Sequence, residues 1–345
     1  MTVKVSAPGK VIITGEHAVV YGEPAIVAAV GLRTRAEAEK SDTVQVKDLR
    51  MGHDLTFSVG EALEHYHMLK KLWQDGSKKS PADFTEVFSH AKEADFKKAC
   101  VGTALFRLGI SKGVKLSITG NIPPGSGLGS SAALSLAIAK SIAESYGKRL
   151  SLEKLNRIAY EVEQFAVGLP SGADNSTCCF GGLIWFQKDT KTGKFSITSL
   201  KKEIPHKLDN FILVYTGRPQ KTTGELVQQV RMHDPKFRDP RIKRIGEIVR
   251  EMKDALKSKD SGKIKSLINE NWTLLRDFGL STPAADKLIE KIKSMGGAAK
   301  LCGGCGGGIA LCYHENPEKL KAAIKSQGFE PMEVELGVEG VRMEK

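Results

Sequence analysis

The chain has 345 residues, which is enough for two domains, and its hydrophobic share of 41% is enough for a packed core. No apolar run could span a bilayer, and charged residues interrupt the apolar N-terminal segment, so we expect a cytoplasmic protein without a signal peptide or a membrane partner. The formal net charge of +12 suits anionic small molecules, whereas the basic residues are too scattered among acidic ones to predict nucleic acid as a partner.

Strands are expected to open the chain on either side of a segment rich in glycine and charge. A strand over residues 2–7 should end at a Pro-Gly pair, and a second apolar strand covers 25–30. The composition of residues 10–22, between them, is typical of a loop that presents side chains to a ligand. Taken alone, however, Lys10 is more often a surface lysine, and His17 is more often a loop histidine with satisfied hydrogen bonds.

The polar segment from 40 to 100 carries little recognisable chemistry. Its apolar spacing predicts two helices, over 60–73 and 81–109. A strand in which apolar and polar side chains alternate follows at 114–119, and a small, apolar helix is predicted at 132–146.

A glycine-rich loop, called the glycine loop below, joins that strand to that helix. Glycines let the backbone approach a ligand closely, and the helix begins with unpaired amides and the positive end of its dipole, which suits phosphate. The loop is not the common P-loop, because no lysine precedes its serines, and its even glycine spacing differs from a dinucleotide site. Taken alone, such a loop is as often a plain turn. It consists of Pro123-Pro124-Gly125-Ser126-Gly127-Leu128-Gly129-Ser130-Ser131.

Two acidic residues lie in and after the next predicted helix, which covers 151–166 and has a serine as its N-cap. Glu163 lies on the polar side of this helix. Asp174 lies in an obligate loop over 168–175, before a buried strand at 181–186. Taken alone, Glu163 is more often a solvated helix residue and Asp174 a residue that caps a turn.

The second half of the chain alternates strands and helices, which indicates an α+β sandwich. Because 188–207 is polar and turn-rich, we place a domain boundary at its start, between domains over 1–187 and 188–345. The predicted strands cover 211–215, 309–313 and 332–336, and the predicted helices cover 224–232, 241–258, 264–278, 284–295 and 317–327.

Six cysteines are present, and in a cytoplasmic chain of this size we expect them to be reduced. Cys302 and Cys305 form a C-x-x-C pair, but a zinc ribbon needs a second pair or nearby histidines, and a redox motif usually opens a helix. Since this pair lies in a glycine-rich segment, we interpret both cysteines as small side chains in a tight turn.

Several blocks in this order resemble the GHMP kinases. They are residues 8–22, which include Gly15-Glu16-His17-Ala18-Val19-Val20-Tyr21-Gly22, the glycine loop, the block that ends in Pro170-Ser171-Gly172-Ala173-Asp174, and Gly306-Gly307-Gly308. One block alone is a weak signal, whereas the ordered set is a strong one. The resemblance runs from residue 3 to about residue 313. It implies an α+β fold of two domains, an ATP-binding domain like ribosomal protein S5 and a ferredoxin-like C-terminal domain, with the active site between them.

The resemblance also implies a function, which is Mg²⁺-dependent phosphorylation of a small alcohol with ATP as co-substrate. Lysine at position 10, where galactokinase-type members usually have arginine, favours the members that phosphorylate the 5-hydroxyl of mevalonate in isoprenoid biosynthesis. A homodimer is implied as well. Two alternatives remain open. One is a member with a phosphorylated acceptor such as 5-phosphomevalonate, to which Arg218 and Lys221 could supply cations, and the other is a non-catalytic ligand sensor on this fold.

The resemblance assigns roles to individual residues. Asp174 matches the base that accepts the proton of the attacking hydroxyl, and Lys10 matches the cation near the γ-phosphate. Ser131 and Glu163 match the metal ligands, and such hard oxygen donors suit Mg²⁺. The positions that support the substrate or the metal are His17, Ser171 and Thr223. The ATP phosphates would be wrapped by Pro123, Pro124, Gly125, Ser126, Gly127, Leu128, Gly129, Ser130, Ser131, Ala132 and Ala133.

Two positions depart from the family pattern. Val167 stands where many members have histidine, and Leu301-Cys302-Gly303-Gly304-Cys305 replaces the more usual Leu-Thr-Gly-Ala-Gly. The second change is chemically mild if the turn acts through its backbone. Since Cys305 replaces a glycine, its backbone must adopt a conformation that non-glycine residues favour, or it is strained.

Overall fold

The computed structural model describes residues 2–80, 82–91, 93–123 and 125–345. Within these ranges a first, eight-stranded sheet contains β1 (Val3–Thr14), β2 (Ala25–Ser41), β3 (Val44–Asp48), β4 (His53–Phe57), β5 (Gly113–Gly120), β6 (Leu183–Lys188), β7 (Phe195–Ser199) and β12 (Arg342–Met343). Its order is β12-β1-β2-β5-β3-β4, with β6 beside β2 and β7 beside β6. A second sheet has the order β11-β8-β10-β9 and contains β8 (Phe211–Tyr215), β9 (Ala298–Leu301), β10 (Ile309–Tyr313) and β11 (Pro331–Met332).

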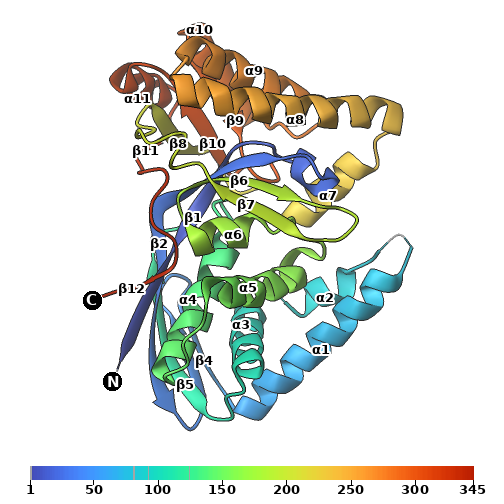
Figure 1. The fold of residues 1–345 in the computed structure, drawn as a ribbon, viewed down its shortest axis with the longest axis vertical. Helices are drawn as coiled ribbons and strands as arrows, with labels where there is room; N and C mark the ends of the chain where they lie inside the picture. Colours follow the sequence, from blue (N-terminus) through green and yellow to red (C-terminus); the bar gives the residue numbers. More distant parts are fainter. Residues whose placement is uncertain (1, 81, 92, 124) are drawn as a thin grey trace.

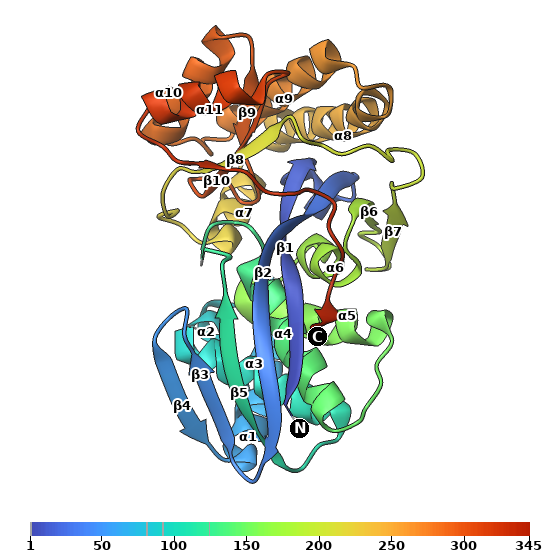
Figure 2. The same cartoon turned by 90° about the vertical axis from the view of Figure 1, so that its left-hand side faces the viewer.

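Helices cover both sheets. Those of the first half are α1 (Val59–Lys78), α2 (Thr85–Ser89), α3 (Glu93–Leu108), α4 (Ser130–Ser145), α5 (Leu152–Val167), α6 (Ala173–Phe180) and the 3-10 helix η1 (Ala18–Tyr21). Helices α1 to α5 lie on one face of the first sheet, and α4 packs directly on β1 and β2 (Figures 1 and 2). The remaining described helices lie with the second sheet and are α7 (Thr223–Arg231), α8 (Pro235–Ser258), α9 (Ser261–Asp277), α10 (Pro283–Ser294) and α11 (Pro317–Ser326).

The apolar core continues across the junction of the two sheets. The larger cluster lies between the first sheet and α3 to α5, and it also includes Met252 of α8 and Leu267 of α9. A second cluster lies around Trp272 and Leu288 in the part of the molecule that holds the second sheet. Because apolar burial is a principal source of stability, this shared core holds the two sheets together, and residues from both can form one site.

Strand β1 is longer than its sequence predicts. The Pro-Gly pair predicts a strand end, and this is wrong, because residues 9–14 continue to pair with β2. Proline lacks the amide hydrogen that a ladder hydrogen bond needs, and the register shifts between Pro8 and Gly9. Lys10 therefore lies on a buried strand and not in a loop.

Short elements account for the other differences. The segment from 40 to 100 contains β3 and β4, and the loop predicted over 168–175 ends early, because α6 begins at Ala173. The helix predicted from Pro81 consists of α2 and α3, and Pro81 itself lies outside the described residues. Strand β7 extends the first sheet beyond the boundary expected between 187 and 188, and β12 returns to β1. Where the two domains divide stays a prediction.

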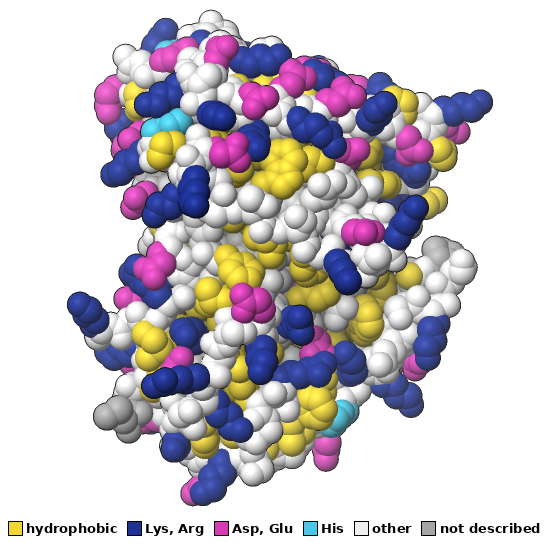
Figure 3. Space-filling model, in the orientation of Figure 1, with side chains coloured by type: hydrophobic (Ala, Val, Ile, Leu, Met, Phe, Trp, Pro, Cys, Tyr) yellow, Lys and Arg dark blue, Asp and Glu magenta, His cyan; other side chains and the backbone are white. Residues whose placement is uncertain are grey.

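The surface carries both signs of charge. On the face in Figure 3, Lys and Arg side chains are interspersed with Asp and Glu, above all over the helices of the second sheet. None of the described helices is long and apolar enough to cross a membrane.

Candidate active site

An ion pair joins β1 to the first turn of α6. Nζ of Lys10 lies 3.0 Å from Oδ2 of Asp174. The lysine side chain is only 3% exposed, whereas the aspartate is 34% exposed and can meet a ligand. Burial lowers the pKa of Lys10, but the Asp174 carboxylate, with smaller contributions from Cys178 and Cys302, raises this pKa above its ordinary value overall. The two groups therefore form a charged pair that is open to solvent on the carboxylate side.

The local sequence fixes where α6 begins. Gly172, just before the helix, has a φ of 92°, and a Cβ there would lie 2.5 Å from the ring of Phe195, so only glycine fits. The hydroxyl of Ser171 accepts a hydrogen bond from the amide of Ala173 at 3.2 Å. Asp174 thus occupies the first helical turn, where the helix dipole favours a negative charge.

A second carboxylate lies behind this pair. Glu163 on α5 is 4% exposed, and its Oε1 has no hydrogen-bond partner among the described residues. Burial and then Asp174 raise its pKa to about 7, while a hydrogen bond with the Ser131 side chain and the charge of Lys10 act in the opposite direction. Ser131 and Glu163 are thus close together, as the family resemblance implies.

These oxygens fit a cation. A buried carboxylate oxygen without a donor, a hydroxyl and a neighbouring carboxylate are the hard donors that Mg²⁺ takes in proteins. Mg²⁺ keeps several waters and needs only one or two protein groups. Among the described residues, no group of three or more His, Cys, Asp and Glu side chains could hold a metal ion.

The glycine loop has the backbone of a tight cradle. Gly125, Gly127 and Gly129 have φ values of 68°, 85° and 69°, in the left-handed region that favours glycine. Helix α4 begins without a side-chain cap, so its first amides remain available. A hydrogen bond of 2.9 Å from the Lys10 amide to the Leu128 carbonyl ties the loop to β1. Pro124, which is also predicted to contact ATP, lies outside the described residues.

The turn over residues 302–308, called the C-terminal turn below, packs against the glycine loop. The Ile309 amide, directly after it, donates to the Ser126 carbonyl at 2.9 Å, which joins the turn to the glycine loop. A Cβ at Gly303 would lie 3.9 Å from Nζ of Lys10. The glycine loop therefore lies between β1 and the C-terminal turn, where the first and second sheets meet.

The two unusual cysteines of this turn are free and buried, as expected for small side chains in a tight turn. Cys305 has a φ of 63°, so it occupies a conformation that favours glycine and carries the strain that the substitution predicts. Its amide donates to the Cys302 carbonyl at 3.3 Å, which closes the turn.

His17 and Thr223 meet at the same turn. Nε2 of His17 lies 3.1 Å from the Gly304 carbonyl, and it must carry the hydrogen because a carbonyl only accepts. Nδ1 is then an acceptor, and it is buried without a hydrogen-bond partner in the part of the chain that the structure describes. Burial lowers the pKa of His17 to about 4, so the ring is neutral. Thr223 packs on the other side of Gly304, where a Cβ would lie 3.3 Å from the Cα of Thr223. Their contact with a substrate stays a prediction.

Sequence reasoning missed a buried ion pair behind the C-terminal turn. Lys300 on β9 contacts the carboxylate of Glu16, and both side chains are fully buried. Nζ of Lys300 also donates to the Ile12 carbonyl at 3.2 Å, and Asn271 of α9 lies 3.5 Å from the second Glu16 oxygen. The only local signal was a lysine within an apolar strand, and its partner is 284 residues away.

Comparison with known proteins agrees with this arrangement. A family model described as the GHMP kinases N terminal domain matches residues 95–182, and one described as GHMP kinases C terminal matches 252–330. The chain is 32% identical to the mevalonate kinase of Thermococcus sibiricus, over 100% of this chain and 99% of that protein.

Solved structures are similar over the whole length. The crystal structure of Methanococcus jannaschii mevalonate kinase has a TM-score of 0.74 and 27% identity, covering 100% of this chain and 98% of that one. The structure of L. major mevalonate kinase in complex with R-mevalonate has a TM-score of 0.73 and 25% identity, covering 98% of this chain and 96% of that one. The chain belongs to the GHMP kinase family and is an ATP-dependent kinase. The α+β, two-domain fold expected from the sequence is confirmed.

Proposed function

We propose that this kinase transfers the γ-phosphate of ATP to the 5-hydroxyl of mevalonate. The observation that carries the proposal is the pairing of buried Lys10 with partly open Asp174 beside the glycine loop. Phosphoryl transfer to an alcohol needs such a carboxylate at the hydroxyl and a cation near the transferred group. The choice of mevalonate is supported by full-length relatives named mevalonate kinase.

Asp174 orients the attacking hydroxyl by accepting its hydrogen bond. A carboxylate is too weak a base to remove an alcohol proton before transfer begins, so Asp174 takes the proton late in the transition state. The ammonium group of Lys10, 3.0 Å from the carboxylate, stabilises the charge that develops on the transferring oxygens. The raised pKa of Lys10 keeps this group charged at neutral pH.

The triphosphate is held by backbone groups. The amides of the glycine loop and of the first turn of α4 donate to the phosphate oxygens, aided by the helix dipole. Ser131 and Glu163 would hold Mg²⁺, which neutralises phosphate charge when it is bound. The unpartnered Oε1 of Glu163 supports this assignment.

A phosphorylated acceptor such as 5-phosphomevalonate is the second candidate. Arg218 and Lys221 line a pocket of about 510 Å³ next to the C-terminal turn. Nε of Arg218 would lie 3.9 Å from a Cβ at Gly125, so a cation is available near the glycine loop for an acceptor phosphate.

A coupled ADP-release assay with ATP, Mg²⁺ and either acceptor separates these candidates. We expect turnover with mevalonate alone, reduced by several orders of magnitude in Asp174→Asn while ATP binding persists. Turnover only with 5-phosphomevalonate would select the second candidate. Near-normal turnover in Asp174→Asn would refute its role as the base, and no turnover with either acceptor would favour a different acceptor or a ligand sensor.

A further inference from the structure

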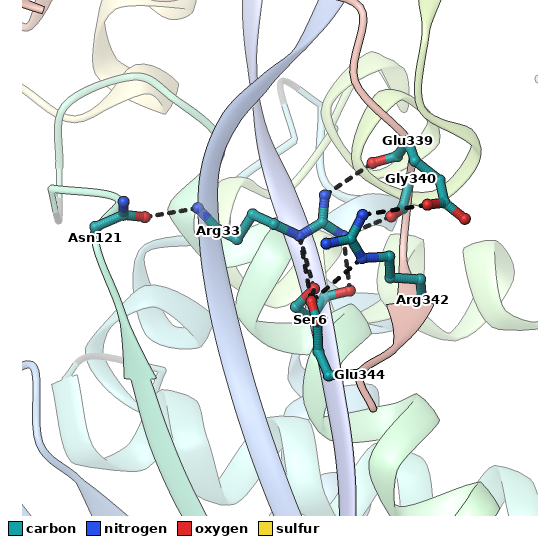
Figure 4. Close-up of polar contacts among 7 residues, drawn as sticks. All are labelled: Ser6, Arg33, Asn121, Glu339, Gly340, Arg342 and Glu344. Carbon is teal, nitrogen blue, oxygen red and sulfur yellow. Dashed lines mark hydrogen bonds and ion pairs between the residues drawn. The ribbon is translucent and has the colours of Figure 1, made fainter. Parts of the chain in front are cut away.

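A buried arginine on β2 holds two distant segments together. Arg33 is 6% exposed, and the groups to which its guanidinium donates among the described residues belong to β1 and to the C-terminal segment (Figure 4). These contacts are Nε to Ser6 Oγ at 2.6 Å, Nη2 to Ser6 O at 3.1 Å, Nη1 to Glu339 O at 2.9 Å and Nη2 to Gly340 O at 2.6 Å. A lysine could not reach these acceptors at once, because it has one nitrogen where arginine has a planar fork of donors.

The C-terminal segment over 333–344, called the C-terminal strap below, crosses from the second sheet to the first. It begins after β11 and ends with β12 paired to β1, and it descends beside the sheets in Figure 2. Backbone hydrogen bonds fasten it along the way. They are Gly31 N to Glu335 O at 2.9 Å, Gly337 N to Ala29 O at 2.7 Å, Gly182 N to Val338 O at 2.7 Å and Val341 N to Cys179 O at 3.2 Å.

The strap is in close backbone contact with the end of α6. A Cβ at Gly340 would lie 2.2 Å from the Cys179 carbonyl, and a Cβ at Gly181 would lie 2.1 Å from the Gly340 amide, so backbone rests on backbone. Helix α6 has only eight residues, and Asp174 lies in its first turn. Because α6 is only about two turns long, its last turn and Asp174 belong to one hydrogen-bonded unit, and we expect a displacement at its last turn to reach Asp174.

The contacts of Arg33 with Ser6 act on β1, the strand that carries Lys10. Ser6 precedes Lys10 by four residues on the same strand, and each guanidinium contact with Ser6 fixes that strand relative to the strap. Arg33 also contacts Asn121, two residues before the glycine loop, but through its backbone, because its amide donates to Asn121 Oδ1 at 2.7 Å. This last contact does not depend on the side chain of residue 33.

We infer that Arg33 is a positioning residue that sets the geometry between Lys10 and Asp174 by clamping β1 to the C-terminal strap. The activity part of this inference rests on the proposed function, since it concerns the same ion pair. Misplacing a reacting group by about 1 Å can cost about 10²-fold in rate. Loss of the clamp should therefore reduce kcat, whereas the KM for ATP should hold, because the backbone contact with Asn121, just before the glycine loop, survives.

The test compares Arg33→Met and Arg33→Lys with Arg35→Met. Arg35 lies on the same strand two residues further on and is exposed, so it is a matched control. We expect kcat to fall at least 10-fold in Arg33→Met with KM for ATP within about twofold, and Arg33→Lys to recover activity in part. Arg35→Met should equal wild type. A folded Arg33→Met protein with kcat within twofold of wild type would overturn the inference, as would equal losses in both methionine variants.

A second measurement is independent of the acceptor. Hydrogen exchange at the Gly182 and Val341 amides reports directly on the strap, and it should accelerate in Arg33→Met but not in Arg35→Met. Unchanged exchange would overturn the clamp even if the wild type proved to use another acceptor, so failure of the proposed function is distinguishable. If Arg33→Met does not fold, Ser6→Ala removes one acceptor and should give the same pattern in milder form.

Discussion

Replacing Lys300 with methionine should destabilise the protein by about 3–5 kcal/mol, because the change leaves the Glu16 carboxylate buried without its partner. Both side chains are 0% exposed, so water cannot compensate for the lost charge. Among the described residues, Asn271 also donates a side-chain hydrogen bond to the Glu16 carboxylate, but at a distance of 3.5 Å. One long hydrogen bond is too weak to stabilise a buried charge.

Two further variants separate burial of charge from loss of contact. Arg250→Met removes an ion pair to Glu23 whose atoms are 2.9 Å apart, but Arg250 is 52% exposed, so its loss should cost about 0–1 kcal/mol. The double variant Glu16→Gln with Lys300→Met carries neither charge. It should regain most of the stability lost in Lys300→Met, because neutral groups are far less costly to bury than one unpaired ion.

Urea unfolding, followed by the fluorescence of the three tryptophans, of which Trp272 is buried beside Asn271, measures these free energies. If Lys300→Met were within about 1 kcal/mol of wild type, as the Arg250→Met control should be, the reasoning from burial would be refuted. A double variant no more stable than Lys300→Met would show that the contacts of the side chain, and not its charge, account for the loss.

The remaining predictions concern the proposed metal site. The pKa of Glu163, about 7, lies above the ordinary value of 4.5, so without Mg²⁺ the folded state binds the proton more tightly than the unfolded state. This contribution to stability is complete below pH 4.5 and is lost as the pH rises through about 7; the wild-type stability minus that of Glu163→Gln should follow this course, and a flat difference would contradict it. Ser131→Ala and Glu163→Gln should each raise the Mg²⁺ concentration needed for half-maximal turnover. An unchanged requirement in both would mean that the metal is held elsewhere.

The parts of the site that lie in local motifs could be predicted from the sequence. The glycine loop combines three glycines with a helix start, and its positive φ values explain why other residues would not serve. Asp174 and Glu163 lie in a block with a recognisable order, and the structure brings Asp174 within 3.0 Å of Lys10, although 164 residues separate them in sequence (174 − 10).

The parts that depend on distant partners could not be predicted. The Pro-Gly pair in β1 has a poor strand propensity, and pairing with β2 overrides it. Nothing near Arg33 or Lys300 in the sequence indicates a buried cation, because Gly340, which accepts from Arg33, lies 307 residues away and Glu16, the partner of Lys300, lies 284 residues away. Strands β3 and β7 are short and contain polar residues, so no apolar run reveals them, whereas the equally short β8 and β10 are almost entirely apolar.

The buried charges gather where the two sheets meet, and this arrangement has a physical cost. Glu163 and Asp174 are close enough to repel each other, and Glu163 is buried with an oxygen that has no donor among the described residues. Hydrophobic residues at these positions would be no less stabilising. Phosphoryl transfer, however, needs charges that are already in place before the substrate arrives, because moving them during the reaction would add to the barrier. The charges that destabilise the free protein are thus the groups that a cation and phosphate would neutralise, so binding of the proposed ligands should stabilise this fold.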